Sequence, residues 1–359
     1  MRLLKVITII LILATISSGQ QGQYSEFNTS RYARVVGLGN AFTGLADDIE
    51  TVYYNSAGLA NLDYYSASYS DGQGTTFAIN DYTADNFALL LPTFSNIGKF
   101  ALSITRLKFN LKDNFTQSLY RLHYARNITD QLSLGASINY YHLFASSYNT
   151  VTRPDGIDEE ISGNTFDISL SALYSIPIAS IPGIINETRL GFQMQNLFDT
   201  DVNLSNEFEP HPKHQILRIG ASTSIIPKLP TVLRLNPIKL ILVADAVFYG
   251  SEYDFNLWQP NFGIEFKLFE IISLRYGREN ENKIGEAYSS SPQHPVKRYG
   301  IGLSVPLHKF LTDYEKLELS FDYSYSDWDK LDETQPMIPM FFDDLPIQES
   351  FSVKLAFQF

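Results

Sequence analysis

The sequence predicts an all-β protein: a transmembrane, antiparallel, up-and-down β-barrel of about 14 strands with an N-terminal hatch or plug in its lumen. Three observations predict this fold. The last eleven residues, 349–359, alternate between apolar and polar side chains and end on phenylalanine. The chain is rich in aromatic residues, with 22 tyrosines and 25 phenylalanines. Long and short connections also alternate between the predicted strands, as they do in bacterial barrels.

The segment 349–359 reads as a strand with one oily face. A period of two places Phe351, Val353, Leu355, Phe357 and Phe359 together, opposite serine, lysine, alanine and glutamine. An edge strand of a soluble sandwich is the alternative for this stretch alone. The terminal aromatic pattern resembles the C-terminal recognition signal of outer-membrane barrels. That resemblance implies that the barrel assembly machinery reads Phe357 and Phe359 during insertion.

The N-terminus has the pattern of a secretory signal peptide. Arg2 and Lys5 precede an apolar run over 6–16, and the small residues of 17–19 follow. The run is too short for a spanning helix, which needs ~20 apolar residues. We therefore expect residues 1–19 to be cleaved. The chain has no cysteine, which excludes an N-terminal lipoprotein anchor, disulfides and thiol chemistry.

Composition excludes further classes. The formal net charge of −12 argues against a nucleic-acid partner, whose backbone repels an acidic surface. No long apolar run follows residue 16, as a helical membrane protein would require. Barrels instead place tyrosine and phenylalanine in girdles at the two membrane interfaces. The predicted location is the outer membrane of a Gram-negative cell, with membrane lipid around the barrel.

Residues 20–62 do not read as strand. Their small residues are expected to permit close backbone packing inside a cavity. A phosphate-binding loop is disfavoured, because no strand precedes the glycines within a βαβ unit. The residues that form the pattern are Gly37, Gly39, Gly44, Asp47, Asp48, Asn55, Ala57 and Gly58.

This pattern resembles the N-terminal segment of the PorV/PorQ family, within the FadL superfamily of outer-membrane proteins. The shared features are an Ala-Arg, the run Gly-Leu-Gly-Asn-Ala-Phe, an Ala-Asp-Asp and a final Asn-x-Ala-Gly-Leu. Ser56 stands where the family usually has proline, which relaxes a fixed φ angle in that turn. The resemblance implies that 20–62 is a hatch in the lumen of a barrel formed by 63–359.

From residue 64 onward the chain repeats strand patterns, most of them long enough to span a membrane at a tilt. Their even number suits a barrel with both ends on the periplasmic side. The predicted strands are 64–71, 86–94, 98–109, 116–127, 131–145, 163–176, 187–196, 214–226, 238–249, 258–267, 270–279, 296–306, 315–327 and 348–359.

Connection lengths give the orientation. The long connections, expected to be extracellular, are 72–85, 146–162, 197–213, 280–295 and 328–347. Most of the others are tight, but 177–186 and 227–237 are longer and rich in proline. Those two leave open a count of about twelve or sixteen strands.

The faces of the strands indicate what fills the lumen. Strand 315–327 separates leucine, phenylalanine and tyrosine from serine and charged residues. Strand 238–249 is mixed, since Ile241 and Val243 share the inner face with Lys239 and Asp245. A lumen lined partly by isoleucine and valine is not a simple water channel. The hatch or an apolar ligand must fill part of it.

Charged residues on the inner faces are expected to form cross-barrel ion pairs or to bind water, because unpaired buried charges are costly. The functional alternative is that some arginine or lysine meets a carboxylate, such as a fatty-acid head group. The inner-face residues are Arg121, His123, Asp167, Arg218, Asp245, Arg275, Arg298, Lys316, Glu318, Asp322 and Lys354.

The predicted outer loops carry two further features. Residues 155–160 resemble a calcium loop only weakly and lack EF-hand spacing, so a solvated acidic loop is favoured. Met337, Met340, Phe341 and Phe342 form an apolar group that is expected to cover the mouth or to receive a ligand.

No catalytic or metal-binding pattern stands out. The six histidines are scattered, and His211 and His214 lack an evident third ligand. We therefore predict no enzymatic activity, no metal and no cofactor; a lipid-acting enzyme is the least favoured alternative.

Two function classes remain. By its resemblance to FadL, the protein would bind a hydrophobic small molecule and pass it across the outer membrane. By its resemblance to PorV, it would be a type IX secretion component that binds secreted proteins. Secretion members usually carry tryptophan where Tyr54 stands, which favours the first class slightly.

Overall fold

The computed structural model describes most of the predicted barrel and hatch. The described residues are 32–75, 81–91, 97–109, 116–145, 161–177, 183–198, 200–205, 215–232, 234–251, 254–280, 295–309, 316–327 and 349–358. The predicted signal peptide therefore lies outside them. Within these ranges, none of the helices has the length and apolar character needed to cross a membrane.

Short helices precede a long series of strands. The helices are α2 (Ala33–Gly37), α3 (Thr51–Tyr54), η2 (Ser56–Asn61) and, near the end of the chain, η4 (Leu307–Lys309). The strands are β1 (Tyr65–Thr75), β2 (Asp81–Leu91), β3 (Lys99–Phe109), β4 (Thr116–Asn127), β5 (Leu132–Ala145), β6 (Ile161–Ile176), β7 (Ile184–Gln195), β8 (Asn203–Leu204), β9 (Gln215–Pro227), β10 (Ile238–Ser251), β11 (Asp254–Leu268), β12 (Ile272–Asn280), β13 (Pro295–Val305), β14 (Lys316–Asp327) and β15 (Glu349–Gln358).

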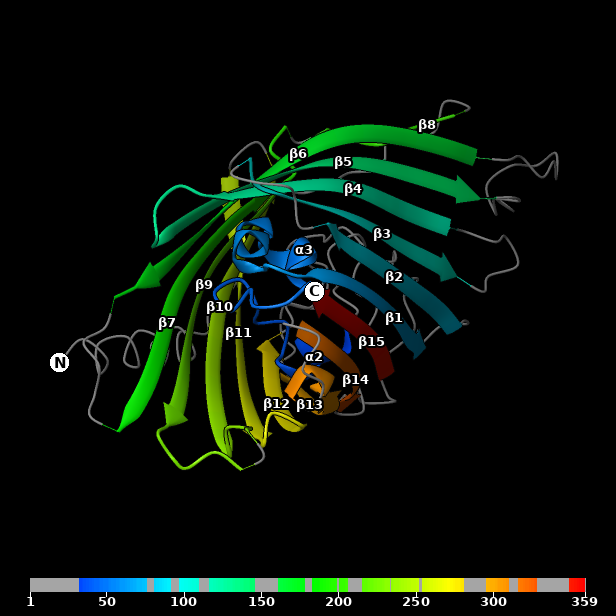
Figure 1. Cartoon of the computed structure of the whole chain (residues 1–359). Coiled ribbons are helices and arrows are strands. Elements are labelled where there is room, and N and C mark those ends of the chain that lie inside the picture. The colour runs from blue at the N-terminus through cyan, green and yellow to red at the C-terminus, as the bar shows by residue number, and fades with distance from the viewer. Residues whose placement is uncertain are drawn as a thin grey trace.

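The strands close into an antiparallel barrel (Figure 1). The sheet has 15 strands, of which β8 has two residues, so 14 strands form the wall. Each long strand pairs with its neighbours in the chain. The short β8 is skipped, so that β7 pairs directly with β9. The last strand returns to the first, with Tyr65 opposite Phe357, where the two rings stack at 5.0 Å. The predicted up-and-down barrel is confirmed.

Strand positions agree with the prediction and some strand ends do not. Each predicted range overlaps one long strand. The predicted long connection 72–85 is wrong, because β1 and β2 pair as far as Thr75 and Asp81. Their polar ends continue the hydrogen-bonded ladder beyond the apolar band, so the apolar pattern stops before the strands do. The short strand β8, which pairs with β6, was not predicted.

The proline-rich connections do not alter the strand count. They lie at the same end of the barrel, where the amide of Lys228 donates to the carbonyl of Gly183 at 2.8 Å. The amide of Phe269 likewise donates to the carbonyl of Pro237 at 2.9 Å. Backbone bonds between successive turns therefore satisfy polar groups that the prolines leave outside the sheet.

Alternation along the strands separates an apolar exterior from a polar interior. On β14, Tyr323 and Tyr325 are 41% and 44% exposed, whereas Asp322 and Ser324 are buried. On β15, Phe351 and Leu355 point outward and Lys354 is buried. Large apolar side chains are exposed on strands all round the wall, as lipid contact requires.

Residues 32–62, here called the inner segment, lie within the ring of strands (Figure 1). Helix α2 contacts β12 to β15, while η2 contacts β3 to β6 on the other side. An apolar cluster joins the segment to the wall: Tyr32, Val35, Leu38, Ala41, Phe42, Leu45, Tyr53 and Tyr54 pack with Ile241 and Val243. The apolar inner face of β10 is therefore covered by this segment.

Candidate functional site

Glycines allow the inner segment to approach the wall at backbone distance. A Cβ on Gly44 would lie 2.7 Å from the backbone of Ala221, and one on Gly191 would lie 1.9 Å from the carbonyl oxygen of Thr43. Gly37 meets Gly300 of β13 less tightly: an ideal Cβ on Gly37 would lie 3.2 Å from the Gly300 Cα, which a shift of a few tenths of an ångström accommodates. The predicted hatch glycine Gly44 thus lies where a side chain would separate the two parts.

Asn55 organises the turn that leads into β1. Its side chain caps η2 by accepting from the amide of Ala57 at 3.2 Å. Its Nδ2 donates to the carbonyls of Thr43 and Ala172, at 2.8 and 3.0 Å. One side chain therefore joins two parts of the inner segment to β6. Gly58 is buried beside Ala46, where a Cβ would lie 2.4 Å from the Ala46 carbonyl oxygen.

Ser56, in the position where the resembling family has proline, hydrogen-bonds to the wall. Its Oγ lies 2.9 Å from Nδ1 of His123, and Nε2 of that histidine lies 2.9 Å from Oγ of Ser103. His123 is fully buried. A side-chain bond thus holds the turn where proline would have restricted φ. This buried Ser–His–Ser chain therefore joins the inner segment to β4 and β3.

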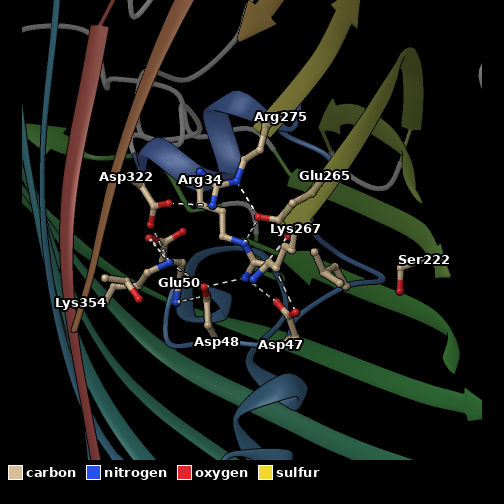
Figure 2. A network of polar contacts seen from close by, with 12 residues as sticks. Arg34, Asp47, Asp48, Glu50, Ser222, Glu265, Lys267, Arg275, Asp322 and Lys354 are labelled. Atoms are coloured by element: carbon tan, nitrogen blue, oxygen red, sulfur yellow. Dashed lines mark hydrogen bonds and ion pairs between the residues drawn. The ribbon is translucent and has the colours of Figure 1, made fainter. Parts of the chain in front are cut away.

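Arg34 is the centre of a buried charge network (Figure 2). Its guanidinium donates to both carboxylate oxygens of Glu265 on β11, at 3.2 and 2.8 Å. It also donates to Asp47 and Asp48, each at 2.7 Å. The side chain of Arg34 is only 4% exposed and that of Glu265 is fully buried. The Ala-Arg and Ala-Asp-Asp motifs therefore meet at Arg34, which also binds the wall carboxylate of Glu265.

Wall residues extend the network across three further strands. Arg275 of β12 donates to Glu265 at 2.6 Å and pairs with Asp322 of β14 at 2.7 Å. Lys354 of β15 pairs with Asp322 at 3.1 Å and with Asp48 at 2.9 Å. The network thus links β11, β12, β14 and β15 to the inner segment. The predicted inner-face charges Arg275, Asp322 and Lys354 belong to it.

Glu50 is a buried member of the network with an incomplete set of partners. Lys354 lies 3.3 Å from its Oε1, while Oε2 has no hydrogen-bond partner among the described residues. Burial raises the pKa of Glu50 to about 8, against the attraction of Lys354. Burial alone would also raise the pKa of Asp48, but Lys354 and Arg34 lower it to about 2. At neutral pH the network therefore favours an ionised Asp48 and a protonated Glu50.

Replacing Glu50 by glutamine is expected to flatten the pH dependence of stability. A folded-state pKa near 8, above an unfolded value near 4.5, means that Glu50 stabilises the fold below pH 4.5. That stability is lost as pH rises through 8. The unfolding midpoint of the wild type, followed by circular dichroism in detergent, should fall over this window, and that of Glu50→Gln should fall less. Glu318→Gln, in a half-exposed pair with Lys316, is the control and should keep the wild-type slope. Parallel profiles for wild type and Glu50→Gln would contradict the assignment.

A second polar group lies around Glu279 of β12. It pairs with Arg298 of β13 and accepts from Asn40 and Gln259, each at 2.7 Å. Asn40 has φ of 58°, in the left-handed region, and its Oδ1 accepts from Tyr54 at 3.1 Å. Sequence reasoning missed Glu265 and Glu279 as lumen residues. The signal was present for Glu265, which alternates with Ile264 and Phe266.

Two wall arginines pack on aromatic rings of the inner segment. The guanidinium carbons of Arg121 and Arg218 lie 4.5 and 5.0 Å from the ring centroids of Tyr53 and Tyr54. Both arginines are buried, and neither forms an ion pair within the described ranges. The ring faces partly compensate the two positive charges.

The other predicted lumen charges serve separate contacts. Asp245 accepts from the amides of Phe42 and Thr43 at 2.9 Å, so it anchors the inner segment. Asp167 accepts from the amide of Phe198 at 3.2 Å, on the wall. Lys316 and Glu318 pair with each other at 2.8 Å and are only partly buried.

Some predicted residues lie outside the described part of the chain. They are Met337, Met340, Phe341 and Phe342 of the predicted outer-mouth group, and Phe359. Among the described residues, no group of three or more histidine, aspartate or glutamate side chains is arranged to hold a metal ion.

A polar cavity of about 330 Å³ borders the charge network. Asp47, Asp48, Arg275, Lys239 and Lys267 are among the charged residues that line it. The turn residues Asn236, Glu270, Pro306 and His308 also line it, which places it at the short-connection end of the barrel. Its charged lining suits water and ions.

Comparison with solved structures identifies proteins with similar folds. The chain is similar to a FadL homologue from Pseudomonas aeruginosa, with 11% identity, a TM-score of 0.51 and coverage of 94% of this chain and 100% of that one. It is also similar to the CymD monoaromatic hydrocarbon channel, with 10% identity, a TM-score of 0.48 and coverage of 92% and 98%. No protein-family model and no curated protein matches the sequence. The likeness to the FadL homologue supports the barrel fold.

Proposed function

We propose that this protein passes a hydrophobic solute across the outer membrane, and that the inner segment is the hatch that opens and closes the path. The observation that carries the proposal is the apolar cluster inside the lumen. Ile241 and Val243 of β10 pack on Tyr32, Val35 and Phe42. Displacement of the inner segment would therefore expose an apolar strip of wall that a hydrophobic solute can follow.

The polar contacts of the inner segment support a hatch that can be released. Arg34, Asp48 and Asn55 hold it to the wall by ion pairs and hydrogen bonds. Such contacts can be exchanged for water, so the closed state is stable but reversible. The shared fold with a FadL homologue agrees with this proposal.

Arg121 and Arg218 are the proposed contacts for a solute with an acidic end. They are buried beside the inner segment without a carboxylate partner in the described structure. A carboxylate that displaced the tyrosine rings would gain charge-assisted hydrogen bonds. A neutral solute would depend on the apolar wall alone.

A disulfide between the inner segment and β13 tests the hatch. Gly37→Cys with Gly300→Cys introduces the only thiols in the chain, at positions where each ideal Cβ lies 3.2 to 3.3 Å from the other Cα. Uptake of hexadecanoic acid and toluene by Gram-negative cells expressing the variant is expected to stop on oxidation and to recover on reduction. Uptake through each single-cysteine variant should not respond to oxidant. Undiminished uptake through the oxidised double variant would refute a moving hatch.

The motif over residues 33–60 favours one other function, a PorV/PorQ-like component of type IX secretion that binds secreted proteins. That function requires a protein partner. Affinity purification of the tagged protein in mild detergent discriminates the two: recovery of a secretion pore or a secreted protein's C-terminal domain supports this second function, provided that solute uptake is absent. We propose no catalytic role for either function.

A further inference from the structure

The outer surface of β12, β13 and β14 changes character in steps toward the end of the barrel that carries connections 281–294 and 328–348. Outward-facing positions recur every second residue, about 7 Å apart along a strand. The first row is apolar, with Leu274 opposite Ile301. The next is aromatic, with Tyr276 opposite Tyr299, and the third is cationic, with Arg278 opposite Lys297. This order of apolar, aromatic and charged rows is that of a membrane interface.

The cationic row is electrostatically unsatisfied. Arg278 and Lys297 are direct cross-strand partners, and like charges in that position destabilise a sheet. Arg278 is exposed and Lys297 is half-buried. Neither forms an ion pair within the described structure, although Asp327 of β14 is the direct cross-strand partner of Lys297. Two cations and one carboxylate leave this patch positive, so it is complementary to an anion.

The rows below indicate what kind of anion fits. Tyr276 and Tyr299 are 37% and 43% exposed, with ring centroids 5.7 Å apart. Leu274 and Ile301, one row further, are 48% and 52% exposed. A ligand seated on the two cations therefore has an aromatic and then an apolar surface directly beneath it. A free inorganic anion would use only the first row, whereas an amphiphile would use all three.

We propose that Arg278 and Lys297 bind the phosphate of a phosphorylated lipid in the leaflet around this end of the barrel. The guanidinium and the ammonium donate to the phosphate oxygens, which removes the repulsion between the two cations. The acyl chains lie along Leu274 and Ile301. This inference concerns the outer wall and is independent of the proposed passage of solutes through the lumen.

A second basic pair on the same rim serves as an internal control. Arg106 and Lys108 also face outward on β3, but Asp85 lies opposite Arg106 in the register. Asp85 pairs with Lys108 at 3.4 Å and accepts from the hydroxyl of Tyr69 at 3.0 Å. Asp71 of β1 lies opposite Asp85, so two carboxylates balance the two cations. This basic pair therefore has less to gain from a phosphate than Arg278 and Lys297.

The test is binding of diphosphoryl lipid A by the purified protein in a phosphate-free detergent, followed by native mass spectrometry. Arg278→Gln and Lys297→Gln are each expected to weaken binding about tenfold or more, since each removes a hydrogen bond between charged groups. Lys108→Gln should change it less than about threefold. Lys297→Arg keeps the charge and should retain binding. Each variant is folded if it migrates faster on a gel before boiling than after boiling.

Two comparison ligands separate the sources of the phosphate. Dephosphorylated lipid A is expected to bind weakly and to be insensitive to the Gln variants. Inorganic phosphate at millimolar concentration is expected to compete poorly. Equal binding of both lipids, equal loss in Lys108→Gln, or full competition by inorganic phosphate would each overturn the proposal.

Discussion

Replacing Arg34 by leucine is expected to release the inner segment from the wall. The change leaves Glu265 buried with a smaller counter-charge and removes the main partner of Asp47. Removing one partner of a buried ion pair typically costs about 3–5 kcal/mol, because the other charge stays buried without compensation. The amides of Phe42 and Thr43 donate to Asp245. Their protection factors in hydrogen exchange should fall by roughly two to three powers of ten.

The matched control is Lys99→Met. Lys99 pairs with Asp63 at 2.6 Å, but Asp63 is 77% exposed, so the pair is solvated and its loss should cost less than about 1 kcal/mol. Arg34→Lys provides an intermediate case, since an ammonium keeps the charge without the two-pronged contact to Glu265. Exchange rates in Arg34→Leu that match those in Lys99→Met would show that the network does not hold the segment.

The sequence predicts the wall of this barrel better than its interior contacts. Alternation places Phe351 outside and Lys354 inside without knowledge of any partner, because period two is a property of one strand. Closure also follows from local features, since an apolar last strand must pair with an apolar first strand. The observed pair of Tyr65 and Phe357 agrees. Local pattern is therefore sufficient for the faces and the strand order.

The partners of the charged residues depend on geometry that alternation does not contain. Arg34 and Glu265 are 231 residues apart, and they meet only because the stagger of the barrel brings β11 level with α2. A shift of one residue in that register would turn Glu265 outward. No pattern in the sequence predicts that Glu50 is buried, since its burial depends on how the inner segment folds against β15. Sequence therefore yields many of the lumen charges, though not Glu265 and Glu279, while the network requires coordinates.

Filling the space at Gly191 is expected to open the lumen. A Cβ there would lie 1.9 Å from the carbonyl oxygen of Thr43 and 2.5 Å from its carbonyl carbon. These are backbone atoms, so no side-chain rotation relieves the clash, and either the inner segment or β7 must move. Because β7 pairs along its length with β9, the segment held by side-chain contacts is the part that yields. Gly191→Leu should therefore raise the conductance of the protein in planar bilayers from near zero to stable open levels.

Phe192→Leu separates this effect from general damage to β7. Phe192 is the next residue, 42% exposed on the outer face, and its replacement leaves the lumen unchanged. It should therefore show the closed conductance of the wild type. Combining Gly191→Leu with the Arg34→Leu change should add little conductance, since both release the same segment and their effects are not independent. A Gly191→Leu protein that folds, as judged by its gel mobility before and after boiling, yet stays closed would show that the inner segment does not block the pore.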